Sequence, residues 1–288
     1  MATTVDVSAA FRSSSVRPGP LALIVEAARE VASRRRLIRY LVQADLRKKG
    51  ADTLLGNLWW VIDPLLQMTV YVILVSFIFQ RSRPDYPLFI FAAILPWKWF
   101  TSSVTDAIGS VTSQDRLIRQ VQFPKIVLPV AAVSSGVVNL AFGLIPLVGL
   151  LVLFYPHRAS LYVALLPAVA AVQFLFTMAM ALVVASVNVF FRDVSNVARH
   201  GLRLWFYLSP GLYSIEQVHE LAGRYGYLGT LMALNPFSVL FESYRDVIYD
   251  QAMPDWAGLL ALAAVSLVLL VVAAVLFKRL EPTFAKVL

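Results

Sequence analysis

Three ionisable side chains lie inside long apolar stretches of the sequence: Asp63, Lys98 and Asp106. A charge at the centre of a bilayer costs about 3 kcal/mol on insertion scales, so Lys98 and Asp106 should face protein or water rather than lipid. Two carboxylates at an aqueous face could bind a metal ion and a nucleotide sugar, which is the chemistry of an intramembrane glycosyltransferase. Asp63 and Asp106 belong to no recognised motif, so this enzyme is the weaker hypothesis. The simpler interpretation of Lys98 is that its long side chain extends toward the nearer end of its helix.

Other common sets of reactive side chains are missing from the sequence. It contains no Cys, and His157, His200 and His219 are scattered without metal-ligand spacing. No Lys follows a Gly anywhere, which excludes a phosphate-binding P-loop, and the GxSxG and HExxH patterns are absent as well. We therefore expect no catalytic, cofactor or metal site in this chain. Any ATP hydrolysis on which it depends must occur on another chain.

The composition indicates a membrane protein. Of the 288 residues, 59% are hydrophobic and 15% are charged, and the mean hydropathy is +0.72. Soluble domains carry about 25% charged residues, so lipid is the expected solvent for most of this chain. Backbone groups in lipid must be satisfied internally, and apolar runs of about 20 residues achieve this as helices. We predict an all-α fold, that of a polytopic helical membrane protein.

The N-terminal region divides into two parts. Residues 1–20 are small, polar and Pro-containing, which is typical of a mobile tail. Residues 21–58 begin with a basic amphipathic stretch that predicts one helix at the membrane surface. Representative positions on this helix are Leu37, Leu41, Arg47 and Lys48. The helix either anchors the chain to anionic lipid or presents a platform to a partner subunit, and the two roles are compatible.

A transmembrane domain of six helices is predicted over residues 59–278. The spans are residues 59–79, 88–112, 126–154, 161–190, 202–213 and 257–277, of which the fifth is short and the last is stopped by Lys278 and Arg279. Lys and Arg are concentrated before residue 59, in the loops at 114–125 and after residue 190, and in the tail at 279–288. The positive-inside rule therefore places both termini and the loop at 114–125 in the cytoplasm.

The segment at residues 227–249 is too short for a span and has one polar face. Asn235 can cap a helix whose first position is Pro236. The predicted apolar face includes Phe237, Phe241 and Tyr244, and the opposite face carries Glu242, Arg245 and Asp246. We expect a re-entrant or surface helix here rather than a seventh span.

Three motifs in order give the chain a family resemblance. They are DRLIRQVQFPKIVLP from residue 115, VFFRDV from residue 189 and LNPFSVLFESYRDVIYDQAMPDW from residue 234. From about residue 36 onward the chain resembles the membrane subunit of type-2 ABC exporters, and in particular the Wzm-like permeases of O-antigen, teichoic acid and galactan exporters. Within that family it is most similar to actinobacterial galactan exporter permeases.

The resemblance implies how the chain meets a partner. Residues 115–123 correspond to the family's coupling helix, which docks into a groove of a Wzt-like, ATP-hydrolysing subunit. The implied docking residues are Asp115, Arg116, Leu117, Ile118, Arg119, Val121 and Phe123. Leu117, Ile118 and Val121 suit such a contact because they supply an apolar face beside charged side chains. The basic N-terminal helix corresponds to the family's interface helix, and residues 214–255 correspond to its extracellular gate helices.

The resemblance also implies an assembly and a substrate. Family members are homodimers that pair with two ATPase subunits, so the partner would bind ATP and Mg and this chain would hold no cofactor. They export a lipid-linked polysaccharide across the bacterial plasma (inner) membrane, where this chain would be a multi-pass protein in contact with membrane lipids. No nucleic-acid partner is expected. Export of teichoic acid or of a smaller lipid is the alternative within transport.

The channel of such an exporter would run between the two protomers. Aromatic rings suit it because they stack on the C–H faces of sugars. The candidate channel or substrate residues are Tyr71, Phe77, Lys98, Trp205, Tyr207 and Tyr213. For Lys98, contact with a pyrophosphate of the lipid carrier is the alternative to the simpler interpretation above.

Overall fold

The computed structural model describes residues 19–51, 54–78, 83–214 and 226–288, and every regular element in these ranges is helical. The helices are α1 (Pro20–Ser33), α2 (Arg35–Gly50), α3 (Trp59–Val72), α4 (Tyr86–Ser110), α5 (Asp115–Gln120), α6 (Val127–Gly149), α7 (Leu166–Phe190), α8 (Val194–Leu208), α10 (Gly226–Ala233), α11 (Pro236–Arg245) and α12 (Trp256–Val287). Wider π-helical turns extend α3 (Ile73–Ile78), α6 (Leu150–Phe154) and α11 (Asp246–Asp250). The all-α prediction is confirmed for the described residues.

Five helical stretches in the described part of the chain are long and apolar enough to cross a membrane. They are Trp59–Ile78, Tyr86–Gln114, Val127–Phe154, Leu161–Phe190 and Trp256–Val287. Each overlaps a predicted span, but the predicted fifth span is not among them. That region belongs to α8, which begins at Val194 instead of residue 202. With 15 residues α8 is only about 22 Å long, against a hydrocarbon core of about 30 Å. Six spans and cytoplasmic termini therefore remain predictions.

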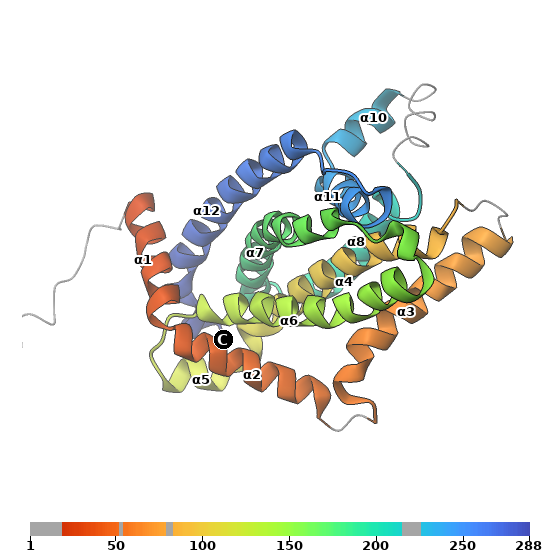
Figure 1. The fold of residues 1–288 in the computed structure, drawn as a ribbon. Coiled ribbons are helices and arrows are strands. Elements are labelled where there is room, and N and C mark those ends of the chain that lie inside the picture. The colour runs from red at the N-terminus through yellow and green to blue at the C-terminus, as the bar shows by residue number, and fades with distance from the viewer. Residues whose placement is uncertain (1–18, 52–53, 79–82, 215–225) are drawn as a thin grey trace, which may run out of the picture.

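Helix α4 lies at the centre of the bundle and packs against α3, α6, α7 and α8 (Figure 1). Its buried side chains surround the helix from Leu88 to Ile108. Trp97 and Phe100 of α4 pack edge-to-face on Phe237 of α11, with ring centroids 4.7 and 4.8 Å away. Such ring pairs contribute stability beyond their buried area, so this aromatic cluster holds α11 against α4.

Two glycines let α6 approach α4 closely. A Cβ on Gly136 would lie 1.9 Å from Ser103 Oγ and 3.1 Å from Trp99 Cδ1. A Cβ on Gly143 would lie 2.2 Å from Leu95 Cδ1. The two glycines are two helical turns apart and therefore share one face of α6. Small residues at a helix contact are the usual way in which membrane helices pack tightly.

The basic N-terminal stretch forms two helices rather than the single one predicted. The break lies at Arg34, whose φ of −97° and ψ of 19° depart from helical values. Beyond it the helices take different neighbours, because α1 packs on α12 and α2 packs on α6 (Figure 1). The sequence has no Gly or Pro at this point, so its periodicity alone could not indicate the break.

Helix α12 is longer than the predicted last span. It does not stop at Lys278 but runs on to Val287, with Pro282 inside it. Asp255 caps its start, because the carboxylate accepts the backbone N–H of Ala257 at 3.1 Å. Figure 1 shows the C-terminal end of the chain close to α5 and α2. The segment predicted as a tail, residues 279–288, is thus packed on the bundle.

Helix α11 begins where the sequence predicts. Asn235 Oδ1 accepts the backbone N–H of Phe237 at 3.1 Å, and Pro236 lies in the first turn, so the predicted cap is confirmed. Phe237, Phe241 and Tyr244 are fully buried in the bundle core. The predicted apolar face therefore packs on protein, and both the re-entrant and the surface alternatives remain predictions.

Arg245, predicted on the polar face of α11, is in fact 3% exposed. Its guanidinium donates to the carbonyl oxygens of Pro210 and Gly211 at 2.7 Å each and lies 3.8 Å from the ring centroid of Phe89. The prediction failed because carbonyl groups of the turn after α8 replace water around the cation, and an isolated helical pattern does not reveal them.

Asp85 ties together the loops at the end of the bundle that lies away from α5. Its Oδ2 is 2.8 Å from His157 Nε2 and accepts from Arg158 Nε at 2.9 Å. Arg158 also donates from Nη1 to the carbonyl of Tyr249 at 3.1 Å. These two hydrogen bonds hold the pKa of the Asp85 carboxyl below its usual range, with His157 as the larger cause and Arg158 as the next.

Replacing Gly136 with Ala should destabilise the bundle. The added methyl group would overlap Ser103 Oγ and press on Trp99, and overpacking of this kind costs about 1–3 kcal/mol. Gly149→Ala is the matched control, because nothing lies within 4 Å of a Cβ at that position. In detergent, the thermal unfolding midpoint should fall for the first variant and stay or rise for the second. An unchanged midpoint for Gly136→Ala would contradict the close approach of the two helices.

Candidate functional site

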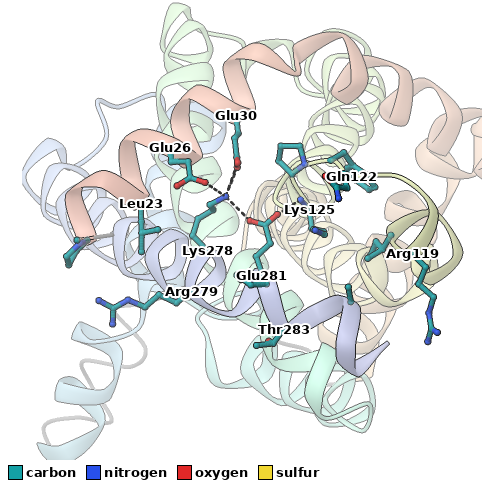
Figure 2. Close-up of a pocket in the computed structure, with 17 residues that line it drawn as sticks. Leu23, Glu26, Glu30, Arg119, Gln122, Lys125, Lys278, Arg279, Glu281 and Thr283 are labelled. Atoms are coloured by element: carbon teal, nitrogen blue, oxygen red, sulfur yellow. Dashed lines mark hydrogen bonds and ion pairs between the residues drawn. The ribbon is translucent and has the colours of Figure 1, made fainter. Parts of the chain in front are cut away.

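Lys278 of α12 is the centre of a cluster of four charges at the α5 end of the bundle (Figure 2). Its Nζ lies 2.9 Å from Glu26 Oε1, 2.9 Å from Glu30 Oε2 and 2.8 Å from Glu281 Oε2. The Lys278 side chain is only 6% exposed, so these carboxylates replace the hydration of its ammonium group. Burial raises the pKa of the Glu30 carboxyl, and the Lys278 ammonium opposes this shift.

Glu281 connects this cluster to the segment that follows α5. Its Oε1 accepts the backbone N–H of Lys125 at 2.6 Å, while Oε2 stays on Lys278. In addition, the carbonyl of Leu288 accepts a hydrogen bond from the guanidinium of Arg119. We call α5 with the residues that follow it up to Lys125 the α5 segment. Helices α1 and α12 are therefore joined to the α5 segment through side chains that come from distant parts of the sequence.

Helix α5 turns one side toward the bundle. Ile118 is 5% exposed and belongs to a buried cluster with Val111, Phe277 and Phe284. Phe123 is partly buried against the same cluster. Ile118 thus anchors α5 to the bundle and is covered, although the sequence analysis includes it among the docking contacts.

The opposite side of α5 is open. The exposed members of the predicted docking set are Asp115, Arg116, Arg119 and Val121, the last with 50% of its surface accessible. The side chain of Leu117 lies outside the described part of the structure. On α2, Leu37 and Leu41 are half-buried, whereas Arg47 and Lys48 are exposed.

A cavity of about 1340 Å³ lies between α1, the α5 segment and the last turns of α12 (Figure 2). Its lining includes Leu23 and Glu26 from α1, Phe123 from the segment after α5, and Lys278 and Thr283 from α12. Its lining contains both apolar and charged groups. The hollow is therefore suited to receive side chains of a protein partner that contacts α5.

A second hollow, of about 270 Å³, lies between α3, α4 and α8. Tyr71 and Tyr207, two of the predicted channel residues, line it together. The polar side chains around them are Gln67, Thr101, Thr105, Arg199 and Arg203. Rings beside hydrogen-bonding groups can stack on the C–H face of a sugar while its hydroxyl groups are bound. We call this hollow the tyrosine cleft.

The other aromatic channel candidates lie outside the tyrosine cleft. Trp205 packs among the core aromatic rings, and its Nε1 donates to Asn235 Oδ1 at 3.1 Å, so it positions the start of α11. Phe77 is 74% exposed on the surface of the bundle. Tyr213 follows α8, and its hydroxyl donates to the carbonyl of Tyr207 at 3.4 Å.

Lys98 and Asp106 of α4 each pair with a group of opposite charge. The Lys98 ammonium pairs with the Asp63 carboxylate of α3. Asp106 pairs with Lys49 of α2, with Nζ and Oδ2 2.7 Å apart. Both α4 charges therefore face protein groups, as the cost of burying them in lipid requires. Lys98 thus has a counter-charge in Asp63, whose side chain is 59% exposed, and the simpler interpretation of Lys98 remains a prediction.

Sequence reasoning missed the two cations that are most buried among the described residues. It places Arg245 on a polar face and treats Lys278 as the stop of a span. The sequence did contain a signal for this cluster. Glu26 and Glu30 are four residues apart and Lys278 and Glu281 are three apart, so each pair lies on one helix face. That signal does not show that α1 lies against α12.

Comparison with known proteins gives consistent matches over most of the chain. The family model described as ABC-2 type transporter matches residues 36–249. The chain is 34% identical to the O-antigen export system permease protein RfbA of Myxococcus xanthus over 263 residues, which cover 91% of this chain and 99% of that protein. Two proteins of the same name from Klebsiella pneumoniae are 27% and 26% identical over 253 residues, covering 88% of this chain and 95% of each. The family match includes α5 and the tyrosine cleft, whereas the Lys278 cluster lies outside it.

Replacing Lys278 with Met should release α1 from α12. The change leaves Glu26, Glu30 and Glu281 together without their cation, and removing one partner of a buried ion pair costs about 3–5 kcal/mol. Hydrogen exchange measured by mass spectrometry should therefore accelerate in peptides that cover α1. Arg279→Met is the control, because that neighbouring side chain is exposed and should leave the exchange unchanged. Equal protection of α1 in both variants would contradict the role of the cluster.

Proposed function

The chain belongs to the ABC-2 type transporter family, and from this premise we propose that it is the permease of an ATP-driven exporter of a lipid-linked polysaccharide, a galactan or an O-antigen-like glycan. Family membership makes the chain a multi-pass membrane permease that works with an ATP-binding subunit. The proposal adds that the permease is a homodimer in the bacterial plasma membrane. It also adds that a Wzt-like partner binds and hydrolyses ATP with Mg.

The tyrosine cleft is the observation that carries the substrate proposal. Tyr71 and Tyr207 offer rings for the C–H faces of sugar residues, and Gln67, Thr101 and Arg203 offer hydrogen bonds to hydroxyl groups. Stacking tolerates different sugars, which suits a long chain that must slide past the site. The relatives named as O-antigen export permeases support the same class of substrate.

The contacts around α5 support a route for coupling. In this proposal, ATP binding closes the partner subunits and pushes α5 through its exposed side. Ile118 packs against the end of α12, and Glu281 holds the backbone of Lys125, so α12 moves with α5. Lys278 then carries α1 along through Glu26 and Glu30. A movement of these joined elements against the rest of the bundle opens the channel.

Substituting the open side of α5 should uncouple the permease from its ATPase. The double variant Arg116→Glu, Val121→Asp reverses one charge and places another on an apolar contact, and a central interface contact is worth about 2 kcal/mol or more, or roughly thirtyfold in affinity. Because Val121 is 50% exposed, the permease itself should still fold and reach the membrane. Co-purification of the ATPase and coupled ATP hydrolysis measure the effect.

Leu161→Asp is the control for this experiment. Leu161 is 93% exposed and precedes α7 at the other end of the bundle, so this variant should keep the ATPase bound. Normal co-purification and hydrolysis with the α5 double variant would rule out docking through this side of α5.

Depleting the chain from cells should trap a glycan-bearing lipid on the cytoplasmic side of the membrane. Mass spectrometry of extracted lipid intermediates would detect it, and re-expressing the wild-type chain should clear it. Tyr71→Ala combined with Tyr207→Ala should fail to clear it because the stacking rings are lost. Trp256→Ala, which removes an exposed aromatic ring on α12 outside the tyrosine cleft, should clear it normally. A trapped polyol-phosphate polymer would instead make teichoic acid the substrate.

A further inference from the structure

A third hollow opens on the flank of the bundle between α3, α4 and α6, where the end of α2 meets them. Its volume is about 390 Å³, and we call it the flank cavity. Two ion pairs line it, Lys98 with Asp63 and Lys49 with Asp106. Lys98 and Asp106 are the thirteenth and twenty-first of the 25 residues of α4, so these two charges lie between the middle and the end of a buried helix. The proposed export mechanism uses none of them.

The balance of charge in the flank cavity disfavours an anionic ligand. Lys49 also contacts Asp45 at 2.8 Å, so three carboxylates face the two ammonium groups. A phosphate would have to displace a carboxylate from Lys98 or Lys49. A neutral hydroxyl group meets no such competition, because it can donate to a carboxylate and accept from an ammonium at the same time.

Two residues that line the flank cavity each carry a buried polar atom that has no hydrogen-bond partner among the described residues. The atoms are Trp99 Nε1, a donor, and Asn139 Oδ1, an acceptor. Trp99 is 3% exposed, so bulk water does not reach most of its side chain. Buried polar groups in proteins are nearly always paired, so an unpaired donor and an unpaired acceptor on residues that line one cavity point to a ligand with hydroxyl groups.

Apolar surfaces complete the site. Trp59 and Trp60 at the start of α3 line the flank cavity, and Trp59 is 44% exposed. Flat indole rings stack on the C–H faces of sugars. From Trp59 and Asp63 an exposed apolar stripe continues along the same face of α3 through Leu66, Val70, Ile73 and Phe77. A ligand with a polar head and a hydrocarbon chain matches this sequence of surfaces.

We propose that the flank cavity binds the uncharged glycosyl headgroup of a membrane lipid. The sugar lies between the two ion pairs and the tryptophans, where its hydroxyl groups satisfy Trp99 and Asn139, and the hydrocarbon chain follows α3. This site deepens the proposed function, on which it rests, because it is where a glycosyl group carried by a lipid meets the permease from the side. The tyrosine cleft lies on a different face of α4.

Native mass spectrometry of the purified full-length permease, with its co-purifying ATPase, tests the site. The probe is monogalactosyl diacylglycerol, titrated in a detergent without a sugar headgroup and compared with phosphatidylglycerol of the same acyl chains. Trp59→Ala and Asn139→Leu should each weaken galactolipid binding about tenfold, because one removes a stacking ring and the other a buried acceptor. Trp256→Ala is the matched control, since that indole is 41% exposed on α12 and lies outside the cavity.

The outcomes separate this inference from the export proposal. Loss of galactolipid binding in the two cavity variants, with full binding in Trp256→Ala, supports the site. Equal binding in all variants overturns it and leaves the export proposal standing. Phosphatidylglycerol binding that is stronger than galactolipid binding and is lost in the same variants also overturns it, because the cavity would then hold an anionic headgroup. Trp59→Ala keeps the test valid if Asn139→Leu fails to fold, since Trp59 lies at an exposed helix start.

Discussion

Compensation of charge away from water is the constraint on which this structure depends. A lone cation inside an apolar bundle costs several kcal/mol, so each must find oxygen atoms within the protein. Lys278 has three carboxylates, Arg245 has the carbonyl groups of a turn, and Lys98 has Asp63. These partners are distant in sequence: 248 residues separate Lys278 from Glu30. Charge compensation therefore helps to decide which helices become neighbours.

The two ends of the bundle are tied in different ways. At one end, Asp85 joins loops through His157 and Arg158, and Arg245 holds the turn after α8. At the other end, Lys278 and Glu281 join whole helices to the α5 segment. In a permease driven by a partner subunit, the second arrangement lets a push on one short helix act on longer ones. Central α4 lies between these ends and also borders both the tyrosine cleft and the flank cavity.

Local signals in the sequence predicted what local forces control. The cap at Asn235 was predictable because its amide and the following proline act within one helical turn. The break at Arg34 was not predictable, because it lies between α1, which packs on α12, and α2, which packs on α6. Ile118 matched the pattern of a docking face, yet its burial against Phe277 depends on residues far along the chain. Of the six channel candidates, only Tyr71 and Tyr207 meet in the tyrosine cleft.

Hydropathy shows where the sequence alone was sufficient and where it was not. It determined that the chain is helical and spans a membrane, because lipid forces long apolar segments to satisfy their own backbone groups. It could not rank the helices by burial. Among the five candidate spans, the one in α12 has the highest mean hydropathy, 3.1, and only 22% of the residues in its 18-residue apolar stretch are buried. The span that contains α4 has the lowest mean hydropathy, 1.2, and 78% of the corresponding residues are buried. In lipid an apolar side chain is as stable on the outside as on the inside, so hydropathy reports contact with lipid. Only the tertiary structure placed the polar, tryptophan-rich α4 at the centre, because its Lys, Asp and Ser side chains need protein partners.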